Sequence, residues 1–170
     1  MALIERRWSP MRGRELTAYE AVMEKFAMSS LGRQYLIRVA PRIDRFVIPR
    51  TNGKWSSAGR SLVGLLTCTG AKSGELRTLP LSAIRRDDHW LLAGSNYGRE
   101  QAPPWVHNLR ANSSCSWEFD QGPQPMIARE LEGDERTEAF DWIKDFYAGY
   151  AVYEQMASHR TIAIFRLDPA

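Results

Sequence analysis

Long apolar segments are missing from this sequence. No stretch approaches the roughly 18 consecutive apolar residues that a membrane-spanning helix requires. The N-terminal segment MALIERRWSPMRGREL carries early arginines but has no continuous apolar core and no small-residue cleavage site, so it does not resemble a secretory signal. We therefore expect a cytoplasmic protein.

Cysteine and histidine are scarce as well. The 2 cysteines, Cys68 and Cys115, lie in apolar surroundings without a nearby partner in sequence, which argues against a disulfide framework and against a CxxC redox or zinc motif. We expect both to be reduced core thiols. The 3 histidines lack the spacing of metal ligands and no carboxylate cluster accompanies them, so we expect no catalytic metal.

What is present is the composition of an ordinary globular protein. The 170 residues, 44% hydrophobic and 25% charged, fit one domain with a sizeable core. Positive charge is concentrated in the first 60 residues, which carry 12 Lys and Arg against 5 Asp and Glu, whereas the remainder carries 11 against 15. Basic helices in this region could contact an anionic membrane surface or a partner subunit, but a solvated helix face is the commoner explanation. We expect no nucleic-acid binding, because no recognised module accompanies the charge.

Two periodicities divide the chain. Helical spacing of apolar residues predicts helices over about residues 15–29 and 34–46, and the segment 49–60, rich in Gly, Ser and Pro, predicts a loop. Short apolar runs bounded by turn residues then predict six strands, in an antiparallel sheet or small barrel. These runs span residues 61–69, 75–85, 89–95, 114–119, 124–131 and 161–167. A helix capped by Asp134 and a short helix at the prolines of APPWVHNLRAN complete the pattern.

The connection TGAKSGELR carries the first candidate site. Its glycines, Gly70 and Gly74, permit backbone conformations that expose consecutive N–H groups. Lys72, Ser73 and Arg77 add a hydroxyl and two cations that can face one anion. The spacing is neither that of a P-loop nor GxGxxG. A phosphate cradle and a solvated hairpin with surface cations are equally good interpretations of this stretch.

The segment GSNYGREQAPPWVHNLRAN is the second candidate. It follows a predicted strand, and its residues Ser95 and Asn96, with Trp105, His107 and Asn108 on a short helix, suit a planar ring with a polar edge. A long loop closed by a packed tryptophan is the simpler alternative.

Tyr147, Tyr150 and Tyr153 form the third candidate. Their spacing of three residues predicts that they share one side of a helix, where phenols can line a pocket and donate a hydrogen bond or a proton. A half-buried packing stripe is the commoner explanation of such a pattern.

Taken in order, these segments resemble the deazaflavin-dependent nitroreductase family of actinobacteria. The resemblance rests on LLTCTGAKSGELRTLPL, LLAGSNYG, PPWVHNLRAN, the helix with spaced tyrosines and the closing strand RTIAIFRL, and it runs from about Asp44 to Leu167. It implies an α+β protein with a mainly β core, a six-stranded antiparallel split β-barrel with N-terminal and flanking helices. We expect a single domain over residues 1–170, with a helical extension over 1–48 and a cofactor-binding core over 61–168.

The resemblance also implies coenzyme F420, an 8-hydroxy-5-deazaflavin with a phosphate and an oligoglutamate tail. An F420-dependent reductase would transfer a hydride from the reduced cofactor to a small hydrophobic, conjugated or nitro-aromatic substrate. Carried over by motif, the cofactor-binding residues are Lys72, Ser73 and Arg77 at the phosphate and tail, Pro80, Leu81, Ala93, Gly94, Ser95 and Asn96 along the ring, and Trp105, His107, Asn108 and Tyr150 closing the site. The catalytic candidates are Tyr150, with Tyr147 and Tyr153 nearby, and Ser95.

Two positions depart from the family pattern. Ala71 replaces an arginine that usually precedes the lysine, and Asn96 stands where the family often has lysine, so two cations are lost near a polyanionic ligand. Arg99 and Arg110 lie near enough in sequence to compensate. An FMN-binding split-barrel oxidoreductase and a non-catalytic cofactor- or ligand-binding protein therefore stay open as alternatives. We expect a monomer or homodimer that meets a small-molecule substrate, with the basic N-terminal helices as a peripheral contact to the inner face of the membrane.

Overall fold

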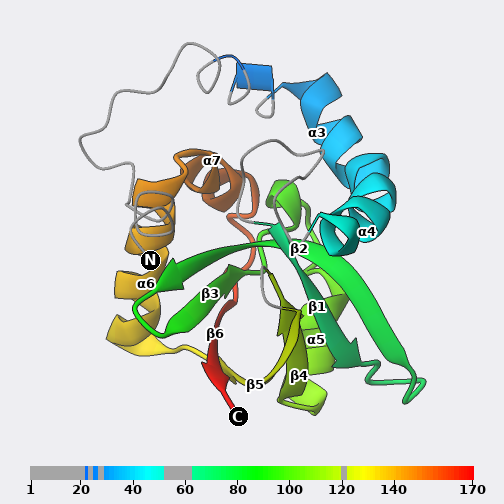
Figure 1. Cartoon of the computed structure of the whole chain (residues 1–170). Coiled ribbons are helices and arrows are strands. Elements are labelled where there is room, and N and C mark those ends of the chain that lie inside the picture. The colour runs from blue at the N-terminus through cyan, green and yellow to red at the C-terminus, as the bar shows by residue number, and fades with distance from the viewer. Residues whose placement is uncertain (1–21, 23–24, 27–28, 52–62, 120–121) are drawn as a thin grey trace.

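The computed structural model describes residues 22, 25–26, 29–51, 63–119 and 122–170. Within them the chain forms a closed barrel of six antiparallel strands in the order β1-β2-β3-β6-β5-β4 (Figure 1). The strands are β1 (Val63–Thr69), β2 (Leu76–Arg86), β3 (His89–Ala93), β4 (Ser114–Glu118), β5 (Pro123–Glu130) and β6 (Ile164–Pro169). The predicted strands and the predicted antiparallel barrel are confirmed.

Helices cover the outside of this barrel. They are α3 (Ser30–Arg38), α4 (Ala40–Arg50), the short 3₁₀ helix η1 (Asn96–Gly98), α5 (Pro104–Ala111), α6 (Gly133–Phe146) and α7 (Gly149–Met156). In Figure 1, α3 and α4 lie on the side of β1 and β2, and α6 and α7 lie on the other side. α4 contacts β1 and β2, α5 contacts β1, α6 contacts β3 and β6, and α7 contacts η1. None of the described helices is long and apolar enough to cross a membrane.

Alternation of side chains along the strands gives one apolar cluster inside the barrel and two on its outside. In β1, Leu66 and Cys68 belong to the core inside the barrel, whereas Val63 and Leu65 pack with Ile48 of α4. A third cluster lies between the outer faces of β3 and β6 and the helices α6 and α7. Because both faces of these strands are covered, their apolar runs are nearly continuous, and this is why they were recognisable in the sequence.

The N-terminal helices differ from the prediction. The single helix predicted over residues 34–46 is wrong, because the chain forms α3 and α4 with a break at Val39. Pro41 lies in the first turn of α4, where a residue without an N–H donor is tolerated. α4 continues to Arg50, into the segment predicted as a loop. Most of the helix predicted over residues 15–29 lies outside the described residues, as does the predicted loop beyond residue 51.

The predicted cap of α6 is also wrong. Glu132 occupies the N-cap position and makes no side-chain cap hydrogen bond, while Asp134 and Glu135 lie in the first turn. Their negative charges complement the positive end of the helix dipole, which explains acidic residues at this position.

The two cysteines lie opposite each other in the barrel wall. Cys68 of β1 and Cys115 of β4 are direct partners in the antiparallel register, and both thiols are free. Burial raises the pKa of the Cys115 thiol to about 11 and also raises the pKa of Cys68. Both thiols are therefore protonated at neutral pH. The pairing was hidden in the sequence, because it is created by the contact between distant strands.

Gly64→Ala is expected to destabilise the barrel. A Cβ atom at position 64 would overlap the Trp117 ring and lie 2.7 Å from the Glu118 carbonyl oxygen. Overpacking of this kind costs about 1–3 kcal/mol, so the variant should unfold at a lower urea concentration. Ser82→Ala, at an exposed position of β2, is the control and should change the free energy of unfolding by less than about 0.5 kcal/mol. Equal stability of the two variants would contradict the packing around Gly64.

Candidate functional site

The hairpin between β1 and β2 is closed by its own backbone. The Gly70 N–H donates to the Glu75 carbonyl oxygen at 2.8 Å, and the Gly74 N–H donates to the Gly70 carbonyl oxygen at 2.8 Å. The Glu75 N–H donates to the Ser73 hydroxyl oxygen at 3.3 Å. These three N–H groups are engaged within the hairpin, so the predicted row of exposed N–H groups is wrong for them. Binding of an anion would therefore fall mainly to the side chains.

A side-chain amide ties this hairpin to α5. The Ala71 N–H donates to Asn108 Oδ1 at 3.0 Å, and Asn108 Nδ2 donates to Cys68 Sγ at 3.6 Å. One amide thus holds the end of β1 and the first part of the turn together. The structure places Asn108, which the sequence assigned to the cofactor site, directly beside the predicted phosphate hairpin.

The charges of the hairpin are partly balanced. Lys72 is exposed and makes no ion pair with the described residues. The Arg77 guanidinium lies 2.7 Å from Glu75, and both side chains are largely exposed. An exposed pair of this kind contributes only about 0–1 kcal/mol, so Arg77 can exchange its partner for an anionic ligand at little cost. Arg110 donates two hydrogen bonds to Glu130, at 2.7 and 2.6 Å, and its charge is not available to the hairpin.

The second candidate segment leaves β3 in a tightly wound turn. Asn96, Tyr97 and Gly98 have φ values of 48°, 56° and 76°, three successive residues in the left-handed region. Asn96 Nδ2 donates to the Gln101 carbonyl oxygen at 2.8 Å, so this side chain is used inside the turn. Ser95 is buried, with 7% of its surface exposed. A left-handed non-glycine residue costs about 1–3 kcal/mol, so other contacts must hold this turn.

Part of that support comes from the connection between α7 and β6. The Arg160 guanidinium donates to three carbonyl oxygens, those of Gly94 at 3.1 Å, Ser95 at 2.8 Å and Arg99 at 3.2 Å. His159 Nε2 lies 2.8 Å from the Glu100 carbonyl oxygen. Sequence reasoning missed both residues, because no local motif announces a contact between segments 60 residues apart.

The tyrosines gather, but not on a single helix. α6 ends at Phe146, so Tyr147 lies in an extended link and only Tyr150 and Tyr153 belong to α7. The prediction of one shared helix face is therefore wrong. The three rings nevertheless meet, with centroids 5.8–6.5 Å apart, and Tyr97 joins them at 5.9 Å from Tyr153. A Cβ atom at Gly149 would overlap the Tyr147 ring, which explains glycine at the start of α7.

Burial raises the pKa of two phenols of this cluster, those of Tyr97 and Tyr150. Desolvation, with Tyr153 nearby, raises the pKa of Tyr97 to about 12 and raises that of Tyr150 further. Both groups therefore stay protonated throughout the physiological range and can act as hydrogen-bond donors. The Tyr97 hydroxyl already donates to the Leu36 carbonyl oxygen at 3.3 Å, which connects the cluster to α3.

α5 joins the hairpin to the turn. A Cβ atom at Gly94 would lie 2.8 Å from the Val106 side chain, so the turn packs directly on α5, while Asn108 reaches the hairpin. Trp105 lies in the barrel core with 3% of its surface exposed, and His107 is exposed. The predicted residues of α5 are therefore divided among the core, the hairpin and the surface.

Strands β2 and β3 supply the remaining predicted residues. Pro80 and Leu81 of β2 and Ala93 of β3 are each half-buried. The register pairs Ala83 with Leu92, so the β2 segment containing Leu81 runs alongside the end of β3. The structure thus brings these ring-lining candidates to the end of the barrel wall where the turn begins.

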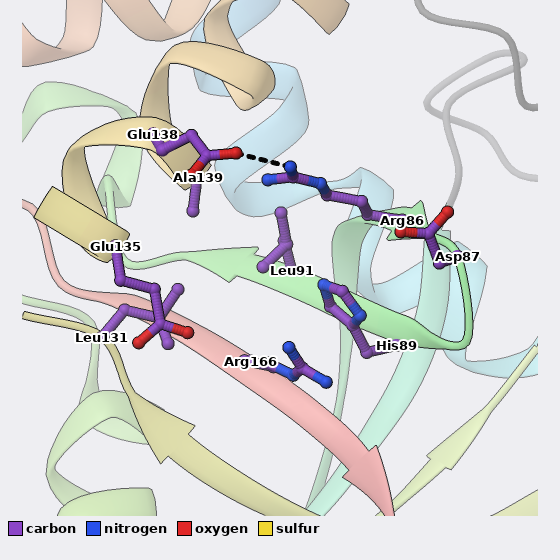
Figure 2. A pocket seen from close by; sticks show the side chains of 9 residues that line it. All are labelled: Arg86, Asp87, His89, Leu91, Leu131, Glu135, Glu138, Ala139 and Arg166. Carbon is purple, nitrogen blue, oxygen red and sulfur yellow. Dashed lines mark hydrogen bonds and ion pairs between the residues drawn. The ribbon is translucent and has the colours of Figure 1, made fainter.

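A cavity of about 250 Å³ lies elsewhere, between the β2–β3 hairpin, α6 and β6 (Figure 2). Its arginines have carboxylate partners, since Arg86 pairs with Glu138 and Arg166 pairs with Asp168. None of the predicted site residues lines it. Among the described residues, no group of three or more histidine, cysteine or carboxylate side chains could hold a metal ion.

Comparison with known proteins identifies related sequences. The profile of the family described as F420H(2)-dependent quinone reductase matches residues 42–169. An F420H(2)-dependent quinone reductase of Mycobacterium tuberculosis is 36% identical over 89 residues, which cover 52% of this chain and 57% of the relative. The matched part of the chain thus spans little more than half the length of this curated relative.

Two solved structures are similar to the barrel and its helices. One is an F420-H2 dependent reductase (FDR-A), with a TM-score of 0.58 and 32% identity, covering 63% of this chain and 94% of the other. The second is described as a domain-swapped dimer, with a TM-score of 0.59 and 29% identity, covering 75% of this chain and 98% of the other.

Asn108→Ala is expected to loosen the hairpin. Loss of the bond to the Ala71 N–H removes about 0.5–1.5 kcal/mol, so amide hydrogen exchange at Ala71 should accelerate roughly 2- to 12-fold. Asn112→Ala is the matched control, since Asn112 Oδ1 likewise accepts from a backbone N–H, that of Ser114 at 3.0 Å. Unchanged exchange at Ala71 in Asn108→Ala, or equal acceleration in the control, would remove the role given to this amide.

Proposed function

Because the chain belongs to the F420H(2)-dependent quinone reductase family, we propose that it reduces a small conjugated acceptor, such as a quinone or a nitro-aromatic, with reduced F420. The observation that carries the proposal is the arrangement around α5. This helix connects a cationic hairpin on one side with a tightly held turn on the other. The tyrosine cluster, in which Tyr153 is buried and the other rings are half-buried, adjoins that turn. A long cofactor with an anionic tail and a planar ring needs two such regions in one protein.

The donor set of the hairpin fits an anionic tail. Lys72 has no carboxylate partner within the described chain, and the Arg77 pair with Glu75 is exposed enough to open. The Ser73 hydroxyl lies between them, 3.4 Å from the Arg77 guanidinium. We infer that these three side chains bind the phosphate and the first part of the tail. Charge-assisted hydrogen bonds of this kind are stronger than neutral ones.

The tyrosine cluster fits the acceptor side of the site. The bound cofactor would supply the hydride. The protein would position the acceptor against the ring, exclude water and keep a neutral phenol in place as a hydrogen-bond donor. We assign this role to Tyr150, whose ring centroid lies 5.8 Å from those of both Tyr147 and Tyr153 and whose pKa is raised by burial. Tyr147 and Tyr153 would shape the opening, and the buried Ser95 would contact the ring.

Cofactor binding tests the assignment. Lys72→Ala should weaken F420 binding, followed by cofactor fluorescence, by about 5- to 30-fold. A charged hydrogen bond contributes about 1.5–3 kcal/mol, and solvent screening at the exposed Lys72 lowers this to roughly 1–2 kcal/mol. Lys144→Ala, which removes a lysine paired with Asp141 on α6, is the matched control and should leave binding unchanged. Tyr150→Phe should bind F420 like the parent but turn over a quinone or nitro-aromatic acceptor more slowly.

The same titration separates the alternatives. FMN is titrated in parallel, and retention of FMN without binding of F420 would favour a flavin enzyme on the same barrel. Tight F420 binding with no reduction of any acceptor would favour a non-catalytic binding protein. Normal binding and turnover in both Lys72→Ala and Tyr150→Phe would show that the site residues are assigned wrongly.

The oligomeric state belongs to the same proposal. The sequence left a monomer and a homodimer open. A domain swap like that named for one similar structure supports the homodimer, because 75% of this chain is covered by that similarity. The hairpin, α5, the turn and the tyrosines all come from one chain.

We also propose that α4 contacts an anionic membrane surface. Its inner face carries the buried Ala40, Asp44 and Ile48, whereas Phe46 is 52% exposed and Ile43 is 40% exposed. The exposed Phe46 ring lies beneath two guanidinium groups, those of Arg45 at 5.1 Å and Arg50 at 6.0 Å. Arg38, Arg42, Arg45 and Arg50 make no ion pair with a described carboxylate. Apolar side chains among unpaired arginines suit the boundary between anionic headgroups and acyl chains.

Vesicle binding tests this contact. The double variant Arg42→Gln with Arg45→Gln should lose about 2 kcal/mol of binding to vesicles containing phosphatidylglycerol, roughly a 30-fold weakening. The control is Arg85→Gln with Lys144→Gln, which removes the same charge from β2 and α6. Failure of the parent to sediment with anionic vesicles, or an equal loss in the control, would refute the proposal.

A further inference from the structure

Arg160 connects α7, the helix that carries Tyr150 and Tyr153, to the turn after β3. It lies in the short connection that follows α7, and its guanidinium forms four hydrogen bonds to three carbonyl oxygens of the turn. The guanidinium has five N–H donors in a rigid plane, so this number of bonds uses most of its capacity. No other described arginine forms as many hydrogen bonds to backbone carbonyl oxygens.

The charge of Arg160 is held without a carboxylate. No ion pair joins it to a described acidic residue, and partial burial lowers the pKa of its guanidinium. Burying a cation is costly unless its donors are satisfied, and here backbone carbonyl oxygens alone satisfy them. A neutral side chain could pack in the connection without this cost. The arrangement therefore points to a need for the guanidinium at this turn.

The turn itself explains that need. Asn96 and Tyr97 both have positive φ values. A non-glycine residue in this region costs about 1–3 kcal/mol of conformational free energy, so the two residues together cost several kcal/mol. Only two backbone hydrogen bonds lie inside the turn, from the Gly98 N–H to the Ser95 carbonyl oxygen and from the Arg99 N–H to the Asn96 carbonyl oxygen. Arg160 adds bonds at both ends of the strained segment and so opposes its relaxation.

The bonds to Arg160 also determine where two peptide groups point. The Gly94 and Ser95 carbonyl oxygens both face the guanidinium. In a trans peptide the following N–H points the opposite way, so the N–H groups of Ser95 and Asn96 both face away from Arg160. Ser95 has φ −67° and ψ −32°, a conformation that keeps consecutive peptide groups parallel. Neither N–H group has a hydrogen-bond partner among the described residues.

We propose that Arg160 is a positioning residue of the cofactor site. Arg160 fixes the turn formed by residues 94–99 (the 94–99 turn) against the end of α7. The turn then directs two parallel backbone N–H donors to the side where the deazaflavin ring binds. The same contact sets the distance between that ring and the tyrosines of α7. This inference rests on the proposed function. The N–H groups of Ser95 and Asn96 suit a carbonyl oxygen of the planar deazaflavin ring. The ring is separate from the phosphate and the glutamate tail of the cofactor.

Two ligands separate the ring from the tail. The probes are F420 and its 8-hydroxy-5-deazaflavin fragment, which lacks the phosphate and the glutamates. Arg160→Gln should weaken binding of both probes by the same factor, about 10-fold or more, because the lost positioning concerns only the ring. Lys72→Ala should weaken binding of F420 and leave the fragment unchanged. Arg160→Lys, which keeps the charge but not the planar fork, should fall between the parent and Arg160→Gln.

The control is Arg136→Gln. The Arg136 guanidinium also donates to a backbone carbonyl oxygen, that of Ile162 at 2.9 and 3.2 Å, but it lies on α6 and its hydrogen bonds go to the residue before Ala163 and not to the turn. Amide exchange at residues 95–99 should accelerate in Arg160→Gln and not in Arg136→Gln. Parent-like fragment binding by Arg160→Gln, or an equal loss in Arg136→Gln, would overturn the proposal.

Failure of the proposed function gives a different result. If the parent binds neither F420 nor the fragment, the cofactor assignment is wrong and the role of Arg160 toward the ring is wrong with it. If the parent binds both probes and Arg160→Gln binds them equally well with faster exchange in the turn, Arg160 only stabilises the loop. Thermal unfolding of each variant shows whether a binding loss accompanies global destabilisation.

Discussion

Closure of the six-stranded barrel is the constraint on which the other features depend. Pairing of β1 with β4 and of β3 with β6 completes the ring and leaves no open sheet edge. It also fixes the distance between the ends of β1 and β3, where the hairpin and the turn begin. Two loops that are far apart in sequence therefore start from rigid positions, and only their own shapes remain to be determined. α5 lies between these two loops and contacts both of them.

Side chains donating to and accepting from backbone groups determine those shapes. Asn108 holds the hairpin through the Ala71 N–H, and Arg160 holds the turn through three carbonyl oxygens. Asn108 reaches its loop from α5, and Arg160 reaches its loop from the connection after α7, which is anchored by the buried Ala157 and Ile162. The order of the core is thus transmitted to the loops. A loop with few internal hydrogen bonds would otherwise open at low free-energy cost. The same two contacts thus make the candidate site a property of the whole fold.

The barrel was predictable because each strand is a short apolar run between turn residues, and this signal is local. The helix break at Val39 had a local signal in Pro41, because proline favours the first turn of a helix. The helix break at Tyr147 was not predictable, since apolar spacing continues through it. The register that faces Cys68 with Cys115 and the reach of Arg160 to the turn were hidden for a related reason. Contacts between distant segments leave no periodic pattern. At the site, motifs supplied residue identities, while the loop contacts required the structure.

The charge of the β1–β2 hairpin limits how much this end of the proposed site can contribute to cofactor affinity, compared with the turn after β3. Ala71 supplies no cation, Arg77 already has an acidic neighbour, and Arg110 is held by Glu130. Exposed charged contacts are weakened by salt and by solvent, so the proposed tail site should contribute only part of the affinity. At the proposed ring end Ser95 is buried and Arg160 holds the carbonyl oxygens of the turn, so less conformational entropy should be lost on binding. Affinity in this chain should therefore depend more on the order of the 94–99 turn than on the number of cations at the hairpin.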